Sequence, residues 1–340
     1  MTQTIKEMKK NFLVKALFIT AVALLCAACY KHHDTGHKVA VLLPDDSIID
    51  RWAIDKQNLE DVMDQYGFDA TFYVAPENED GAVQQVQQIK TAIKSGAKYL
   101  VITPIDYNAI NESKVLEQYP NVKVVCHDRF IQNNPCIDFF SSTDTKEIGR
   151  MQAMFLLNHY HSSGAATMTI EILAGPDTDN NAKDYYDGAM DLLRKYIVGG
   201  QLIVKSGKKE YNDVKADSWD VADGKEAMED RLASYAEGEY PDMVLASSDN
   251  MAQGAIEALM EAGITDVPVI TGQDNSEMTQ TYIKAKKQTM TIDKNLRDMA
   301  YNTGLLVNGL ISKSPVQTSQ SVDGVPVLYS KITLVTIDSF

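Results

Sequence analysis

The stretch VKVVCHDR (residues 122–129) contains the pattern that decides the predicted fold. A short apolar strand, VKVVC, runs directly into the polar residues His127, Asp128 and Arg129. Two further strands end in the same way, MVLAS (243–247) before Ser248-Asp249-Asn250 and VPVIT (267–271) before Gly272-Gln273-Asp274. In open α/β sheets, ligands bind in the crevice outside the carboxyl ends of the strands. We therefore expect these three strand ends to meet at one site.

The polar groups at these strand ends suit a ligand that is rich in hydroxyl groups. A carboxylate accepts two hydroxyl hydrogen bonds, and an arginine fork donates to two neighbouring oxygens. A pyranose offers this chemistry around its rim. The pattern therefore favours a sugar as the ligand.

Strands and helices alternate on both sides of this stretch, which predicts parallel sheets with helices on both faces. The first half combines strands 37–43, 69–75, 98–103, 121–126 and 137–142 with helices 50–66, 79–94 and 108–118. The second half combines helices 145–160, 181–197, 222–237, 250–262, 276–286 and 295–311 with strands 167–174, 201–206, 242–247, 267–271, 288–292 and 326–337. We expect an α/β fold of two doubly wound parallel-sheet lobes that face each other.

The N-terminus has the pattern of an export signal. Lysines precede or enter an apolar run over 12–25, and small residues follow it, so we expect residues 1–28 to be removed. The segment resembles a bacterial lipoprotein signal with Cys29 as the lipidated residue, although Cys26 stands where such signals usually have leucine. An ordinary signal peptide or a short anchor is the alternative. Residues 29–37 would form a polar tether, whose histidines His32, His33 and His37 are not expected to bind metal.

Composition and charge narrow the classes of partner. The chain has 340 residues, 44% hydrophobic and 23% charged, as expected for a globular protein of two domains. Its formal net charge of −15 repels phosphate backbones, so we expect no nucleic-acid partner. No apolar run after residue 29 reaches the roughly 20 residues that span a bilayer, so membrane contact would be through the lipid alone.

Two cysteines remain in the body of the mature chain. Cys126 ends one predicted strand and Cys136 immediately precedes another. In an oxidising compartment they could form a disulfide, or they could be buried thiols that pack as small apolar residues. The spacing leaves both alternatives open.

Six short fragments stand in order along the chain: Arg51-Trp52, Asp128-Arg129, Asp179-Asn180-Asn181-Ala182, Tyr186-Asp187-Gly188-Ala189-Met190, Gly272-Gln273-Asp274 and Thr289-Met290-Thr291-Ile292-Asp293-Lys294. In these fragments the sequence resembles the periplasmic sugar-binding proteins of the type 1 class, above all D-xylose-binding and multiple-monosaccharide-binding proteins. The resemblance covers nearly all of residues 38–338.

The resemblance implies two lobes joined by three hinge crossings, near Thr143, near Asp293 and near Gly324. The first lobe would comprise residues 38–142 plus 293–323, and the second 143–292 plus 324–340. It also implies a monomeric, lipid-anchored receptor at the bacterial periplasm or cell surface that captures a monosaccharide. An ABC transporter permease or a membrane sensor kinase would be its docking partner.

The resemblance implies a role for each site residue. Arg51, Asp128 and Arg129 of the first lobe would bind the sugar hydroxyls and ring oxygen, opposite Asp179 and Asn181 of the second lobe. Asp274 and Lys294 would grip adjacent hydroxyls as a carboxylate–ammonium pair. The two tryptophans, Trp52 and Trp219, would stack on the apolar faces of the ring.

Some of these positions allow a structural interpretation instead. Asp249 is as well suited to be a helix N-cap as a ligand. Trp52 could pack in the core, and Lys294 could lie on the surface. Ser248 stands where many relatives have asparagine. Asparagine has an amide that both donates and accepts hydrogen bonds, whereas serine has a single hydroxyl, so the identity of the sugar stays open.

The motifs of common enzymes and cofactor sites are absent from the sequence. It contains no G-x-S-x-G, G-x-x-x-x-G-K-[ST], G-x-G-x-x-G or H-E-x-x-H. The run Asp177–Asn181 begins like a calcium loop, but Ala182 and Gly188 replace its glycine and its bidentate glutamate. We therefore expect a binding protein without cofactor or metal. A carbohydrate-active enzyme is the less favoured alternative, because no carboxylate is marked as acid or nucleophile.

Overall fold

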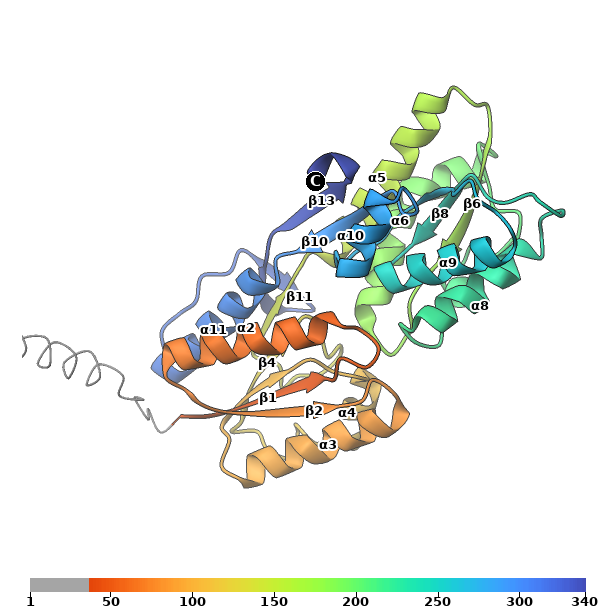
Figure 1. Ribbon diagram of the computed structural model, residues 1–340. Coiled ribbons are helices and arrows are strands. Elements are labelled where there is room, and N and C mark those ends of the chain that lie inside the picture. Colours follow the sequence, from red (N-terminus) through yellow and green to blue (C-terminus); the bar gives the residue numbers. More distant parts are fainter. Residues whose placement is uncertain (1–36) are drawn as a thin grey trace, which may run out of the picture.

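Two α/β lobes make up residues 37–340, the part of the chain that this computed structural model describes (Figure 1). The predicted signal peptide, Cys29 and the tether histidines His32 and His33 lie outside the described residues. No helix between residues 37 and 340 combines the length and the apolar character needed to cross a membrane.

The first lobe is built on a seven-stranded sheet in the order β11-β12-β5-β4-β3-β1-β2. Its strands are β1 (Lys38–Pro44), β2 (Asp69–Ala75), β3 (Tyr99–Ile102), β4 (Lys123–His127), β5 (Phe139–Ser142), β11 (Gln320–Val322) and β12 (Val325–Tyr329). All neighbours run parallel except β11 and β12, which form an antiparallel pair.

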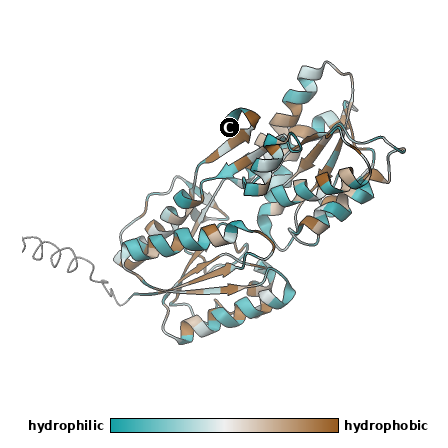
Figure 2. Cartoon of the chain, viewed as in Figure 1, coloured by the Kyte–Doolittle hydropathy of each residue, from teal (hydrophilic) through white to brown (hydrophobic). Residues whose placement is uncertain are grey.

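Helices cover both faces of this sheet, which explains why its inner strand β1 is almost wholly apolar. Val39, Val41 and Leu43 of β1 pack with α2 (Arg51–Tyr66) and α11 (Leu296–Ser312) on one face. Ala40 and Leu42 pack on the other face, where α3 (Glu79–Lys94) and α4 (Tyr107–Ser113) lie. Parallel strands buried on both faces are expected to be almost wholly apolar. Figure 2 shows the hydrophobic strands inside and the hydrophilic helix surfaces outside.

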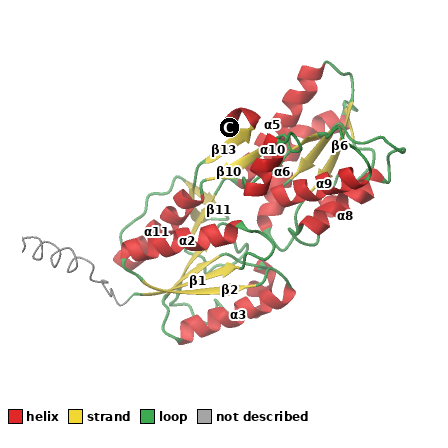
Figure 3. Ribbon diagram, in the orientation of Figure 1, coloured by secondary structure: helices red, strands yellow, loops and turns green. Residues whose placement is uncertain are grey.

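The second lobe has a four-stranded parallel sheet in the order β7-β6-β8-β9, with helices on both of its faces (Figure 3). Its strands are β6 (Met168–Leu173), β7 (Leu202–Ile203), β8 (Met243–Ala246) and β9 (Val269–Ile270). Its helices are α5 (Thr145–Ser163), α6 (Asn180–Val198), α7 (Tyr211–Val214), α8 (Val221–Leu232), α9 (Asp249–Glu261) and α10 (Glu277–Lys284). Helices α5 and α6 approach closely because Gly149 has no side chain: a Cβ there would lie 2.0 Å from the Tyr185 carbonyl oxygen.

The chain passes three times between the lobes. It leaves the first sheet after β5 to enter α5, and returns after β10 (Met290–Lys294) to enter α11. It leaves again between β12 and β13 (Ile332–Thr336), which pairs antiparallel with β10 before the short 3-10 helix η1 (Ile337–Ser339). One chain thus builds both lobes, which are connected by three crossings.

The last crossing differs from the prediction. We assigned residues 324–340 to the second lobe as one strand over 326–337, but the strand is interrupted at Ser330. Its first part, β12, pairs with β5 in the first sheet, and the Ser330 amide donates to the Ser142 carbonyl at 2.7 Å. The assignment was wrong for β12, and the third crossing lies at Ser330 rather than near Gly324. The run from Val325 to Thr336 contains no glycine, and only the polar pair Ser330-Lys331 marks the position of the break.

Candidate functional site

The carboxyl ends of the strands in both lobes meet across the cleft and enclose a small space, which we call the inner cavity. Its free volume is about 10 Å³, room for about one water molecule. It is lined by Ile49, Arg51, Asp128, Arg129, Asp179, Asn181, Tyr185, Trp219, Gln273, Asp274 and Lys294. Eight of the eleven residues that the sequence predicted to bind the ligand therefore line one cavity.

Arg51, the first residue of α2, is the centre of the charge network. Its three guanidinium nitrogens each face a different carboxylate: Nη1 lies 2.7 Å from Asp55 Oδ2, Nη2 2.7 Å from Asp128 Oδ2, and Nε 3.3 Å from Asp274 Oδ1. Burial acts to lower the pKa of Arg51, but these carboxylates outweigh it and raise the pKa above its usual value. Arg51 is therefore a fixed cation.

Asp128 faces Arg51 because of a tight turn after β4. The Arg129 amide donates to the His127 carbonyl at 2.7 Å, and Asp128 has a φ of 62°. This left-handed conformation is uncommon outside glycine, though aspartate tolerates it better than most residues. Burial acts to raise the pKa of Asp128, but Arg51 and then Lys294 lower it below its usual range. The carboxylate is therefore ionised at neutral pH.

Arg129 joins the first lobe to the second. Its Nη2 donates to Glu77 Oε1, and its Nε lies 2.9 Å from Asp179 Oδ2. Asp179 is the N-cap of α6 and also accepts a hydrogen bond from Trp219 Nε1 at 3.1 Å. Burial raises the pKa of Asp179 despite the opposing effect of Arg129. Gly175 makes room for the indole, since a Cβ there would lie 2.2 Å from the ring.

Asp274 and Lys294 form the ion pair that the sequence predicted. Lys294 Nζ lies 3.0 Å from Asp274 Oδ1, and their side chains are 2% and 11% exposed. Lys294 ends β10, while Asp274 follows β9 with a φ of 108°. A non-glycine residue in this region is strained by about 1–3 kcal/mol and is most often found at a functional site.

Several acceptor oxygens in this network have no hydrogen-bond donor among the described residues. Asp128 Oδ1, Asn181 Oδ1 and Gln273 Oε1 are all buried, and all three residues line the inner cavity. An unsatisfied buried acceptor typically costs about 1–3 kcal/mol. Such oxygens fit a ligand that brings O–H donors.

Direct contacts hold the two lobes together around the cavity. The Phe130 amide donates to Asn180 Oδ1 at 3.0 Å, and Asn181 Nδ2 donates to the Asp128 carbonyl at 3.1 Å. Asn250 Nδ2 donates to the Ile48 carbonyl at 2.8 Å. With the Arg51–Asp274 and Arg129–Asp179 ion pairs, these bonds close the cleft.

The structure places Trp52, Ser248 and Asp249 outside the lining of the inner cavity. Trp52 is 1% exposed, and the Arg51 and Arg129 guanidiniums lie 4.1 and 5.1 Å from the centre of its ring. It therefore supports the two arginines rather than facing the cavity. Ser248, not Asp249, is the N-cap of α9.

Asp249 is buried among donors of its own lobe. Its Oδ1 accepts from Thr291 Oγ1 at 2.8 Å and from Gln288 Nε2 at 3.0 Å, and its Oδ2 accepts from the Ser276 amide at 3.2 Å. Burial, and then the nearby charge of Asp274, raise the pKa of Asp249 to about 7. Its carboxyl group is thus used to connect α9 with the strand end that bears Asp274.

The predicted alternatives for the cysteines are also resolved. Within residues 37–340 Cys126 and Cys136 are both free thiols, so no disulfide joins them. Cys126 lies in β4 and packs in the first-lobe core, and burial raises the pKa of its thiol to about 12. Within residues 37–340 no group of three or more His, Cys, Asp or Glu side chains is arranged to hold a metal ion.

The predicted binding residues left out five residues of the site, namely Asp55, Tyr185, Glu77, Gln273 and Ile49, and the first four carried a usable signal. Asp55 and Tyr185 stand one helical turn after Arg51 and Asn181, at the spacing that shares a helix face. Glu77 follows the strand predicted over 69–75, so it met the same strand-end rule as Asp128. Gln273 adjoins Asp274 in a fragment already singled out, and Ile49 precedes α2 without a distinguishing signal.

Comparisons with known proteins agree with this geometry. A family model described as a periplasmic binding protein domain matches residues 39–313. The multiple sugar-binding periplasmic receptor ChvE of Rhizobium radiobacter is 30% identical over 85% of this chain and 83% of its own length. The D-xylose-binding periplasmic protein of Escherichia coli is 28% identical over 92% of this chain and 91% of its own. An ABC transporter solute binding protein from Clostridium phytofermentans with bound β-D-glucose is 29% identical, with a TM-score of 0.82, covering 88% of this chain and 94% of that one.

Proposed function

This chain belongs to the periplasmic binding protein family, and from that premise we propose that it captures a neutral aldopyranose between its lobes for an ABC importer. Members of this family are solute receptors, so the chain is not an enzyme. The sugar-binding relatives of about 30% identity support a sugar as the ligand. The ABC transporter solute binding protein with bound glucose supports an ABC importer as the docking partner.

One observation carries the proposal: buried donors and unsatisfied acceptors converge on the inner cavity from both lobes. Arg51, Arg129 and Lys294 supply donors, while Asp128 and Asn181 present oxygens without a partner among the described residues. A sugar hydroxyl both donates and accepts, so a pyranose satisfies both sets. The polar groups are thus arranged to hold hydroxyls.

The charges around the cavity favour a neutral sugar over an acidic one. Three cations and three carboxylates line it, and Asp55 and Glu77 add two further carboxylates behind Arg51 and Arg129. A uronate or phosphate would therefore meet excess negative charge in a buried site, where screening by salt is weak.

Sugar entry requires the lobes to separate, because the inner cavity has room for about one water. A bound pyranose would take the place of the Arg51–Asp274 and Arg129–Asp179 contacts and would reconnect the lobes through its hydroxyls. We favour xylose over glucose in this narrow space, since xylose lacks the hydroxymethyl group. We also propose lipid attachment at Cys29 and a monomeric state, on sequence grounds.

Calorimetric titration of the purified protein with xylose, arabinose, ribose, glucose, galactose and fructose tests the function. We expect micromolar or tighter binding to one or two aldopyranoses, without turnover, and at least tenfold weaker binding of glucuronate. If no sugar of the panel binds, monosaccharide capture is wrong.

A further inference from the structure

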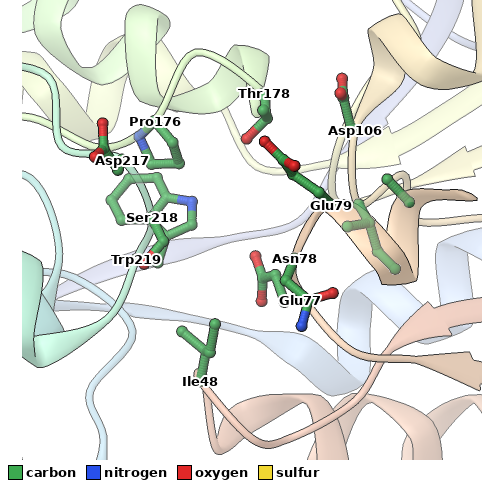
Figure 4. Close-up of a pocket in the computed structure, with 12 residues that line it drawn as sticks. Ile48, Glu77, Asn78, Glu79, Asp106, Pro176, Thr178, Asp217, Ser218 and Trp219 are labelled. Carbon is green, nitrogen blue, oxygen red and sulfur yellow. The ribbon is translucent and has the colours of Figure 1, made fainter.

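A second cavity, which we call the outer cavity, opens between the lobes beside the inner one (Figure 4). Its volume of about 330 Å³ lies within the usual range for small-molecule sites. Trp219 lines both cavities, and Glu77 of the outer cavity is ion-paired with Arg129 of the inner one. We propose that the outer cavity binds a second, neutral sugar ring, so that the protein takes disaccharides and related glycosides as well as monosaccharides. This inference extends the proposed function and rests on the same site.

Apolar groups of both lobes form the walls of the outer cavity. Ile48 and Ile105 belong to the first lobe, and Pro176 and Trp219 to the second. Figure 4 shows Pro176 and the Trp219 indole on one side, across the space from Glu77 and Glu79. A pyranose has apolar C–H faces that pack on such walls, as rings do on tryptophan and proline surfaces.

Hydrogen-bond acceptors form the rim of the outer cavity. Glu77, Glu79, Asp106 and Asp217 contribute carboxylates, and Thr178 contributes a hydroxyl. Carboxylates accept hydrogen bonds from sugar hydroxyls, and the apolar walls between them suit the C–H faces of the same ring. The combination fits a ring with an apolar face and a hydroxyl rim.

The rim also selects the charge of that ring. Among the described residues that line the outer cavity there is no lysine or arginine, and its carboxylates are not arranged to hold a metal ion. A uronosyl or phosphorylated ring would therefore be repelled, while a neutral ring would not. Trp219 and Glu77 lie where the two cavities adjoin, so the glycosidic oxygen of a bound disaccharide would lie between these two side chains.

Titration of the purified full chain with xylobiose, cellobiose, maltose and their monosaccharides tests the proposal. At least one neutral disaccharide should bind within tenfold of its monosaccharide. A uronosyl counterpart, glucuronosyl-β-1,4-glucose, should bind at least tenfold more weakly than cellobiose, and the double variant Glu79→Gln/Asp217→Asn should reduce that difference.

A substitution that fills the outer cavity with a large side chain gives the decisive test. Thr178 points into the outer cavity from the loop before α6 (Figure 4). Thr178→Trp should weaken the disaccharide at least tenfold and change the monosaccharide less than threefold. Thr91→Trp is the matched control, because Thr91 is exposed near the far end of α3, about 18 Å along the helix from Glu79.

The outcomes separate this inference from the proposed function. If monosaccharides bind and no disaccharide does, or if Thr178→Trp affects both classes equally, the outer cavity does not hold a second ring and the proposed function stands. If only disaccharides bind, monosaccharide capture is wrong and the second ring is supported. If neither class binds, both proposals are overturned.

Discussion

Replacing Asp274 by asparagine tests the ion pair at the centre of the cleft. Asp274 is the only carboxylate within ion-pair distance of Lys294 among the described residues; the Lys294 side chain is buried and that of Asp274 is 11% exposed. Removing one partner of a buried pair typically costs about 3–5 kcal/mol, because the other charge is left without compensation. Arg51 keeps its ion pairs with Asp55 and Asp128, so the loss of its contact with Asp274 adds little to this cost. We therefore expect Asp274→Asn to lower the free energy of unfolding by about 3 kcal/mol.

The double variant separates loss of charge from loss of shape. In Asp274→Asn/Lys294→Met no unpaired ammonium remains, so part of the lost stability should return, with an interaction energy of about 1–3 kcal/mol between the two sites. Urea unfolding at pH 7 without sugar measures these values. Asp323→Asn is the matched control, because Asp323 is also in a left-handed conformation but exposed, and it should change stability by less than about 0.5 kcal/mol.

The same variants separate stability from sugar binding. If Asp274 accepts charge-assisted hydrogen bonds from a sugar, both should weaken binding by about 1.5–3 kcal/mol, although the double variant is the more stable of the two. A loss of stability below 1 kcal/mol in Asp274→Asn, or strictly additive effects in the double variant, would refute the ion-pair reasoning.

Three further predictions concern other groups. The pKa of Asp249 is raised to about 7 from an unfolded value near 4, so between these pH values the folded state binds a proton that the unfolded state does not. The contribution of Asp249 to stability is therefore full below about pH 4 and is lost as the pH rises through 7. Asp249→Asn should remove that part of the pH dependence when urea unfolding is measured at pH 5 and pH 8. Iodoacetamide should label half-buried Cys136 before Cys126, because the thiol pKa of buried Cys126 is raised to about 12. Both cysteines should react once urea unfolds the protein. A Cys126–Cys136 crosslink in mass spectra would contradict the free thiols. Cys29→Ser should release the protein from membranes and abolish labelling by radioactive palmitate, whereas unchanged membrane association would exclude lipid attachment at this residue.

The part of the site that lies at strand ends was predictable from the sequence. Asp128, Arg129 and Asp274 each follow an apolar run, and parallel strands bring their carboxyl ends to one edge. Arg51, Asp179, Asn181, Trp219 and Lys294 came from the resemblance, and the structure places all five on the inner cavity. Long amphipathic helices such as α3 and α6 were expected within one or two residues of their observed bounds.

Other features depend on packing that no local pattern records. The β12–β13 break required knowledge that β12 pairs with β5, a partner almost 190 residues earlier in the chain. Trp52 lies beside Arg51 in sequence, yet its ring is held by two guanidiniums and Glu77 rather than turned to the cavity. Ser248 and Asp249 were both predicted to bind the sugar, with a helix N-cap as the alternative for Asp249, and neither lines the inner cavity. Ser248 is the N-cap of α9. Either residue type can cap a helix, and only the position of the helix N-terminus decides which one does.

The closed cleft makes ligand affinity a difference between two sets of contacts. A sugar must supply more than the inter-lobe contacts that it replaces, chiefly Arg51–Asp274 and Arg129–Asp179. The attraction within a buried charge pair is largely offset by the cost of removing both charges from water, so these ion pairs contribute little net free energy to holding the lobes together. Three acceptors have no donor in the part of the chain that the structure describes: Asp128 Oδ1, Asn181 Oδ1 and Gln273 Oε1. They gain most from a ligand, because each would receive a hydrogen bond that it otherwise lacks. Specificity should therefore depend more on these three oxygens than on the ion pairs, and a deoxy sugar that lacks a hydroxyl opposite one of them should bind at least tenfold more weakly than its parent.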